Sequence, residues 1–155
     1  MSKEETVYVD ATGKVAGRLA SIVAKMLLNG KRVIILNAEK AIITGKKSRI
    51  VNWYMKKLSI QSKVNPRRHG PFKPKTPDGI LRRMIRGMLP RKKPKGKEAL
   101  RRLRVYVGIP QNLKNVKLTE FTEAIYRRNP YGYMTLEELA RILGWKPVKE
   151  RVSGG

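Results

Sequence analysis

Residues 6–37 read TVYVDATGKVAGRLASIVAKMLLNGKRVIILN, and they carry the clearest secondary-structure signals in the chain. The first four, Thr6–Val9, are β-branched or aromatic and precede a turn signal, which is typical of a short strand. From Val15 to Leu27 apolar residues recur at i, i+4, i+7 and i+8, which predicts an amphipathic helix. The run Arg32–Asn37 is almost continuously apolar, as in a strand covered on both faces in a parallel sheet. The segment therefore predicts strand, helix, strand.

A strand-helix-strand unit of this kind predicts an α/β fold. It requires a right-handed crossover, and it brings both strand ends to the same edge of the sheet, where the loop 37–39 lies. Further along, we expect short strands at 41–44 and 105–107 and helices at 48–58, 80–89, 98–103 and 135–143. The last helix has a capping box, Thr135 and Glu138. We expect residues 1–110 to form an α/β core and residues 111–155 to form a helical C-terminal extension that packs on the core or on neighbours.

The charge of the chain is strongly and unevenly basic. The 155 residues carry a formal net charge of +25, and 41% of them are apolar, enough for one core. Between Ser62 and Arg104, sixteen Lys and Arg residues face two acids, whereas the rest of the chain has twenty bases and nine acids. Because phosphate neutralisation releases condensed counterions, such a segment favours binding to nucleic acid.

The composition also argues against several classes of protein. There is no cysteine, hence no disulfide, thiolate metal site or cysteine nucleophile, which suits a reducing compartment such as the cytoplasm. Residues 1–10 are polar and acidic, unlike a secretory signal, and no window approaches eighteen continuous apolar residues. We therefore expect a cytoplasmic protein that does not cross a membrane.

The expected helix at 80–89 is sharply amphipathic. At about 100° per residue, one half of the helical wheel is apolar and the other half is basic. The apolar half holds Ile80, Leu81, Met84, Ile85, Met88 and Leu89, and the basic half holds Arg82, Arg83 and Arg86. A solvated face is the ordinary explanation for such charges, but no acid stands three or four residues after them. The helix is short and lacks Trp anchors, so RNA is a better partner than a membrane surface.

Basic segments flank this helix on both sides. The loop from Ile60 to Gly79 is broken by prolines and glycines, and its Lys and Arg content favours ordering on a partner. In that loop His69 follows Arg67 and Arg68, which suggests base stacking or phosphate contact rather than catalysis. After the helix, residues 91–97 form a rigid basic turn. Phe72 either stacks on a base or anchors the loop to the core.

Two glycine-containing segments resemble nucleotide-binding motifs, but neither completes one. Gly13 and Gly17 lie between a strand and a helix, yet the G-x-G-x-x-G fingerprint is absent, so a simple turn with close helix packing is the better interpretation. The segment 44–48 resembles the end of a phosphate loop and fails as a Walker motif. Its cations Lys46, Lys47 and Arg49 either hold RNA phosphates or are solvated.

An enzyme remains an alternative at this point. A nucleotide-dependent enzyme on the same α/β core would need titratable groups at the strand ends, and the candidates there are Asp10, Glu39 and Lys46. With His69 the single histidine, no histidine-based metal cluster is possible. We therefore expect no catalytic residue, no metal and no cofactor.

Several sequence blocks, in the right order, resemble the universal large-subunit ribosomal protein family usually numbered thirteen. The blocks are Val7–Ala11, Gly17–Ser21, Val33–Ala38, Ile43–Lys47 and Arg86–Pro90. Two further segments, Asn65–Phe72 and Leu143–Pro147, look like the archaeal and eukaryotic branch, and the short termini favour the archaeal one. The resemblance runs from Val7 to about Pro110.

This resemblance implies a fold, a role and a set of contacts. The fold is a three-layer α/β/α arrangement with a small, mostly parallel sheet. The role is structural: binding and stabilising large-subunit rRNA, beside neighbouring ribosomal proteins and without a membrane or a small-molecule substrate. The positions that would face RNA are Lys46, Lys47, Arg67, Arg68, His69, Arg82, Arg83, Arg86, Arg91, Lys92 and Lys93. We add the nearby Arg49, Lys73 and Lys95. A regulator that binds messenger RNA away from the ribosome would use the same surface.

Overall fold

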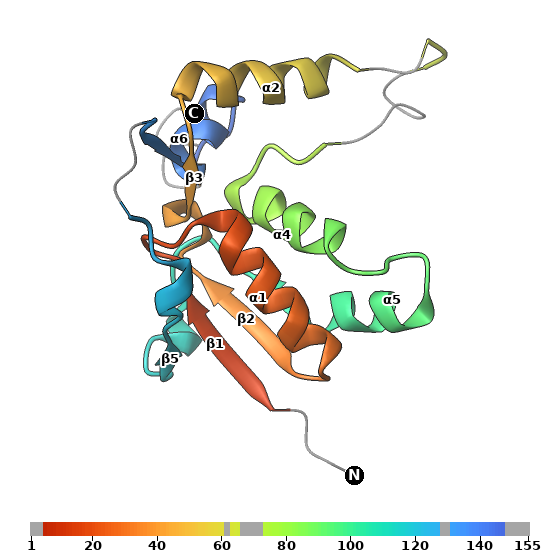
Figure 1. Cartoon of the computed structure of the whole chain (residues 1–155), viewed down its shortest axis with the longest axis vertical. Coiled ribbons are helices and arrows are strands. Elements are labelled where there is room, and N and C mark those ends of the chain that lie inside the picture. The colour runs from red at the N-terminus through yellow and green to blue at the C-terminus, as the bar shows by residue number, and fades with distance from the viewer. Residues whose placement is uncertain (1–4, 61–62, 66–72, 128–130, 148–155) are drawn as a thin grey trace.

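The computed structural model describes residues 5–60, 63–65, 73–127 and 131–147. Its centre is a four-stranded parallel sheet with the strand order β4-β2-β1-β5. These strands are β1 (Thr6–Asp10), β2 (Arg32–Leu36), β4 (Leu103–Val105) and β5 (Leu118–Thr119). The helix α1 (Ala16–Leu28) connects β1 to β2 and lies across the sheet (Figure 1). The expected strand-helix-strand opening and the α/β fold with a mostly parallel sheet are confirmed.

The two faces of the sheet differ in burial. Val7 and Val9 of β1 lie in register with Val33 and Ile35 of β2, and all four side chains are buried in the main core. Leu19, Val23 and Leu27 of α1 belong to the same core cluster, as the sequence periodicity predicts. On the opposite face the side chains of Tyr8 and Ile34 are half-buried, and Arg104 in the same row is exposed.

A second, smaller sheet stands beside the first. It pairs β3 (Ile42–Thr44) with β6 (Tyr133–Thr135) in antiparallel register, and the 3-10 helix η1 (Ala38–Lys40) joins β2 to β3. Thr135 then caps α6 (Leu136–Ile142), because its Oγ1 accepts the backbone N–H of Glu138 at 3.2 Å. The Thr135 half of the expected capping box is confirmed, whereas the Glu138 carboxylate forms an ion pair with Lys47 at 3.0 Å.

Three more helices complete the described structure. They are α2 (Lys47–Ser59), α4 (Pro77–Gly87) and α5 (Pro94–Arg101); two short 3-10 helices, η2 (Gln111–Leu113) and η3 (Thr122–Ala124), lie in the C-terminal third. Figure 1 shows α4 and α5 beside α1, while α2 runs along the top of the molecule, away from the large sheet. In α2 Ile50 alone is buried. This helix is therefore the most weakly anchored of the three.

Helix α4 begins three residues before the expected start. Thr76 accepts the backbone N–H of Gly79 through its Oγ1 at 3.3 Å, and Pro77 occupies the first turn, where a missing N–H costs nothing. The helix ends at Gly87, so Met88 is its C-cap and is exposed. The expectation that the helix extends to residue 89, with Met88 on its apolar face, is therefore wrong. Met84 is half-buried, and the fully buried face consists of Ile80, Leu81 and Ile85.

Two other boundaries differ from the sequence prediction. Helix α5 starts at Pro94 rather than at residue 98, because proline is well suited to a first helical turn. Strand β4 of the large sheet is Leu103–Val105 rather than 105–107, because Leu103 pairs with Val33. The chain then leaves the sheet, and Tyr106 O accepts the backbone N–H of Ala38 at 3.1 Å.

Residues after 110 contribute to the same core as the first part of the chain. β5 extends the large sheet, and Leu136 and Leu139 of α6 lie in the main core cluster. The backbone N–H of Val15 donates to Ala124 O at 2.7 Å, which ties η3 to the start of α1. The C-terminal third therefore packs on the α/β core, and the proposed boundary at residue 110 stays a prediction.

Candidate nucleic-acid interface

The edge of the sheet where an enzyme site would form is occupied by structural hydrogen bonds. Asp10 Oδ1 accepts the backbone N–H of Thr12 at 2.9 Å, the hydroxyl of Thr12 at 2.7 Å and the side-chain amide of Asn37 at 3.1 Å. Asn37 adopts a left-handed conformation with φ of 58°. This set of contacts fixes the turn after β1 and joins it to the end of β2.

The pKa of Asp10 reflects the same contacts. Partial burial alone would raise the pKa of this carboxyl group, but the hydrogen bonds from Thr12 and Asn37 and the charge of Lys14 together lower it below its ordinary value of 3.8. A carboxylate held in its charged form by local donors is a poor general acid or base near neutral pH.

Glu39 and Lys46 do not complete a catalytic set with Asp10. Glu39 Oε2 accepts the backbone N–H of Gly108 at 2.8 Å, which fastens the loop after β4. Lys46 is exposed and stands at the N-cap of α2. The carboxylates of Asp10 and Glu39 therefore both accept hydrogen bonds that hold loops in place.

The glycine segments are turns. Gly13 has a φ of 71°, a conformation that favours glycine, and Gly45 has a φ of 129°. The N–H of Gly45 donates to Gly132 O at 3.1 Å, so the segment that resembled a phosphate loop is paired with the C-terminal third. A Cβ added at Gly17 would meet nothing within 4 Å. The expected close helix packing at Gly17 is therefore wrong.

The basic face of α4 has the composition expected from the sequence. Arg83 is exposed, Arg82 and Arg86 are half-exposed, and no ion pair joins these three guanidiniums to an acidic group in the described ranges. Asp78 stands one turn before Arg82 and still forms no ion pair with it. The opposite face of α4 is buried and the helix packs on α1, so the arginine face is held in a fixed orientation.

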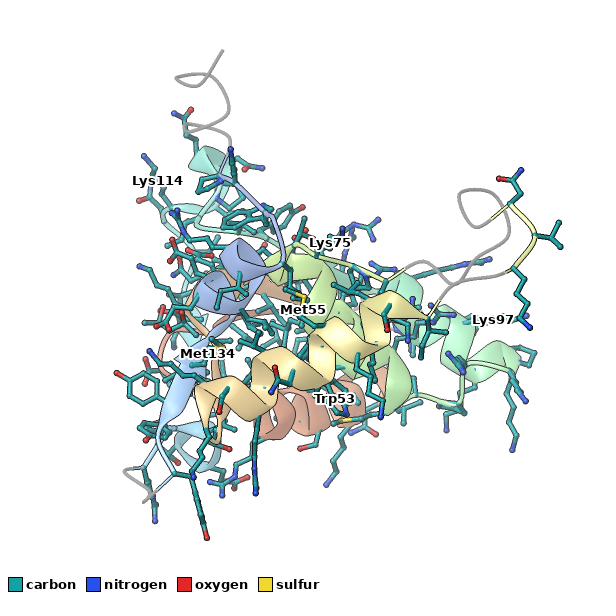
Figure 2. All side chains as sticks on the ribbon, turned by 90° about the horizontal axis from the view of Figure 1, so that it is seen from above. Trp53, Met55, Lys75, Lys97, Lys114 and Met134 are labelled. Atoms are coloured by element: carbon teal, nitrogen blue, oxygen red, sulfur yellow. The ribbon has the colours of Figure 1, made fainter. Side chains whose placement is uncertain are left out.

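The basic tract after α4 folds back beside the helix. Arg91, Lys92, Lys93 and Lys95 are all exposed. Arg86, Arg91, Lys92 and Lys97 line one shallow hollow of about 700 Å³ between α4 and α5, and no acidic side chain lines it in the part of the chain described. Lys97 is exposed, and Figure 2 shows it at one end of the molecule. The structure therefore brings the helix and the tract into one cationic surface.

The turn between α4 and α5 is held by backbone packing. The N–H of Lys93 donates to Pro90 O at 3.0 Å, and Gly96 is buried so close to Pro90 that an added Cβ would overlap the Pro90 carbonyl group. Not every cation nearby is free, because the guanidinium of Arg102 donates to Leu27 O at 2.5 Å and ties the end of α5 to α1.

The cations at the start of α2 have different surroundings. Lys47 forms an ion pair with Glu138 of α6 at 3.0 Å, so part of its charge is neutralised. Lys46 and Arg49 are exposed and line a hollow of about 690 Å³ that continues along α2 towards α4. Of the three, Lys46 and Arg49 are the better placed for phosphate.

Lys73 belongs to a third cluster that the sequence prediction recognised only in part. It lines a cavity of about 270 Å³ between α2 and α4 together with Arg83 and Lys57. Lys57 Nζ lies 3.7 Å from the ring centroid of Trp53, one helical turn earlier. Trp53 and Lys57 were missing from the predicted set, although their i, i+4 spacing within an expected helix was a usable signal.

Four residues singled out in the sequence lie outside the described residues. They are Arg67, Arg68, His69 and Phe72. Across residues 5–60, 63–65, 73–127 and 131–147, no group of three or more His, Asp or Glu side chains could hold a metal ion. In the same ranges, no helix combines the length and apolarity needed to span a bilayer.

Fold and surface together define a class: a small α/β protein with fixed, unpaired cations on neighbouring helices, as in nucleic-acid-binding proteins. Residues 4–112 match the family described as Ribosomal protein L13. The chain belongs to the ribosomal protein L13 family, which confirms the resemblance seen in the sequence blocks.

Individual relatives extend the similarity beyond residue 112. A protein of Methanocaldococcus jannaschii is 48% identical over 138 residues, which cover 89% of this chain and 97% of the relative. A protein of Sulfolobus acidocaldarius is 42% identical over 143 residues (92% and 96%), and one of Archaeoglobus fulgidus is 40% identical over 147 residues (94% and 92%). Each of the three is named large ribosomal subunit protein uL13. The similarity agrees with the archaeal branch of the family.

Proposed function

We propose that this protein is a structural constituent of the large ribosomal subunit, where it binds and stabilises large-subunit rRNA during assembly and translation. Family membership carries the proposal, because archaeal relatives that match nearly the whole chain are named large ribosomal subunit protein uL13. The protein then works in the cytoplasm, in the ribosome, beside other large-subunit proteins. Its partners include neither a membrane nor a small-molecule substrate.

The proposed contact surface consists of the cations described above. It comprises Lys46, Lys47, Arg49, Arg67, Arg68, His69, Lys73, Arg82, Arg83, Arg86, Arg91, Lys92, Lys93 and Lys95. What supports this set is that Arg83, Arg91 and Lys92 are exposed without acidic partners in the described ranges. Such cations position a protein on the RNA backbone without reading its sequence. We expect phosphate contacts to dominate.

The large positive charge is consistent with a protein that stays attached to a polyanion. A net charge of +25 destabilises the compact state through self-repulsion when the protein is free. Each phosphate contact releases counterions, so affinity falls with salt, with a log-log slope of roughly 0.7 to 0.9 per contact. Binding to rRNA therefore removes a repulsion as well as adding contacts.

We propose that the protein is not an enzyme and uses no cofactor. This proposal is supported by the family, whose members are ribosomal, and by the use of Asp10 and Glu39 as loop acceptors. A catalytic site needs titratable groups that converge on one cavity. The cavities described above are lined by apolar and cationic groups instead.

The proposal is tested by binding the purified protein to transcripts of large-subunit rRNA over a series of salt concentrations. We expect tight binding at low salt, a steep linear fall in log affinity with log salt, and weaker binding to a small-subunit rRNA transcript. A nucleotide titration of the same protein is the counter-test. Saturable binding of a free nucleotide at micromolar concentration, with no preference for large-subunit rRNA, would contradict the proposed function.

A further inference from the structure

Between α2 and α4 lies a cavity with an apolar floor and a basic rim. Its volume is about 270 Å³, and its floor includes Trp53, Tyr54 and Met84. The rim is formed by Lys57 of α2, Arg83 of α4 and Lys73 of the segment before α4. Within the described part of the chain, no acidic side chain lines this cavity.

Trp53 is unusually exposed for its size. Its side chain is 52% exposed, although Tyr54 beside it is half-buried and the two rings meet edge to face, with centroids 4.8 Å apart. An indole ring normally contributes its large apolar area to a core or an interface. Here the neighbouring Tyr54 packs against the core cluster, and Trp53 faces the cavity. The ring is therefore available to a partner.

The cations at the rim have no acidic partner among the described residues. Lys57 Nζ stands over the Trp53 ring, and the pKa of Lys57 is lowered first by partial burial and then by the positive charges of Lys73 and Arg83. Lys73 and Arg83 form no ion pair with an acidic residue in the described ranges. An anionic group at this rim would relieve the mutual repulsion of the three cations.

A second hollow continues the first along α2. It has a volume of about 690 Å³, and Trp53, Tyr54 and Met84 line both spaces. Its cations are Lys46 and Arg49. A single strand that ran along α2 would thus pass from Lys73 and Arg83, over Trp53, to Arg49.

We propose that this cavity is a stacking site for an unpaired base of the ribosomal RNA, with the base on Trp53 and its flanking phosphates on Lys57, Lys73 and Arg83. The inference rests on the proposed function and adds a specific contact to it. Unstacked bases in loops and bulges are characteristically held by aromatic side chains with cations nearby. A side chain of a neighbouring protein could fill the apolar floor, but it would leave the three cations unneutralised.

Substitution of Trp53 separates stacking from electrostatics. Trp53→Ala should weaken binding to a large-subunit rRNA transcript about 5- to 150-fold at fixed salt, which is the usual effect of removing the platform of one stacked base. The log-log salt slope should stay unchanged, because the ring releases no counterions. Trp53→Phe should recover most of the affinity. Lys57→Gln should instead lower the slope, by roughly 0.7 to 0.9.

Met55→Ala is the matched control. Met55 is 43% exposed on the same helix, and Figure 2 shows it on the other side of α2 from Trp53. Its removal should leave both affinity and slope unchanged. Since both side chains are exposed, neither substitution should unfold the protein, which circular dichroism of each variant checks.

Fluorescence gives a direct second readout. The chain has two tryptophans, so Trp145→Phe leaves Trp53 as the single tryptophan, whose emission can be excited selectively over that of the tyrosines. Binding of the rRNA transcript should quench this emission, and a fully paired RNA duplex should quench it much less.

The outcomes separate this inference from the proposed function. If wild-type protein binds the transcript and Trp53→Ala binds it equally well, the stacking site is wrong while the proposed function stands. If Trp53→Ala binds naked rRNA normally but is missing from assembled subunits, a neighbouring protein fills the cavity and the stacking site is equally wrong. If the wild-type protein does not bind the transcript at all, the proposed function itself fails.

Discussion

At the scale of single residues, Asp10 shows how a polar group at a strand end serves the fold. Its carboxylate accepts three hydrogen bonds at the turn after β1. The sequence placed Asp10 at the sheet edge correctly, but a sequence pattern alone does not reveal whether such a carboxylate faces a substrate or its own backbone. The hydrogen bonds from Thr12 and Asn37 show that the Asp10 carboxylate holds the turn. Asn37 lies at the end of another strand, 27 positions away in the sequence.

Asp10→Asn tests the contribution of this charge. The folded-state pKa of Asp10 is lowered, so its stabilisation is present above the ordinary value of 3.8 and disappears as the pH falls through the lower folded-state value. We expect the wild-type protein to be more stable than the variant at pH 7, by about 1 to 3 kcal/mol. Urea unfolding between pH 2 and pH 7 measures this difference. A difference that stayed constant over the whole range would contradict the assignment.

Gly96→Ala tests the close packing between α4 and α5. An added Cβ overlaps the Pro90 carbonyl group, so we expect a decrease of about 1 to 3 kcal/mol in the free energy of unfolding. Gly17→Ala is the control, because a Cβ there meets nothing within 4 Å and the position is helical. Alanine at Gly17 should be neutral or stabilising by up to about 1 kcal/mol. Equal effects at the two positions in thermal unfolding would refute the close packing at Gly96.

At the scale of elements, α4 has a buried face and a basic face that can be perturbed separately. The buried face was predictable because apolar periodicity is a local property of the sequence. The end of the helix at Gly87 was not predictable in this way, and it leaves Met88 exposed. Burial at a helix terminus depends on where the chain turns next.

Ile85→Ala and Met84→Ala compare these positions. Ile85 is fully buried, so its truncation should cost about 2 to 5 kcal/mol. Met84 is half-buried beside the cavity, so its truncation should cost distinctly less. Chemical denaturation of both variants gives the comparison. A larger destabilisation by Met84→Ala would show that α4 packs in a different rotation.

Replacing Arg82, Arg83 and Arg86 together by Gln tests the basic face. The fold should remain intact, because these side chains form no ion pair in the described ranges. Affinity for large-subunit rRNA should fall, and the log-log salt slope should drop by roughly 0.7 to 0.9 for each arginine that binds a phosphate. Replacement of the paired Arg141, which bonds to Glu137 within α6, is a charge-matched control for one arginine. An unchanged slope in the triple variant would mean that these arginines are only solvated.

At the scale of the whole molecule, the elements that could be predicted are those in which apolar and polar residues follow a regular pattern over many positions. The opening strand-helix-strand unit and the capped helix α6 were found because each has many residues in phase. The strands β5 and β6, of two and three residues, carry too little pattern and are defined by their partners β1 and β3. Of the cluster of Lys57, Lys73 and Trp53, the sequence predicted only Lys73, because the three residues come together only once α2 lies over α4.

The central claim is that this basic surface serves the large ribosomal subunit. Sucrose-gradient sedimentation of native extract from cells that express the chain tests it most directly, with fractions probed for the protein at low and at moderate salt. We predict that the protein travels with the large subunit and stays there at moderate salt, because many phosphate contacts must be broken together. A protein that remained at the top of the gradient at both salt concentrations, as a free small chain, would contradict the claim.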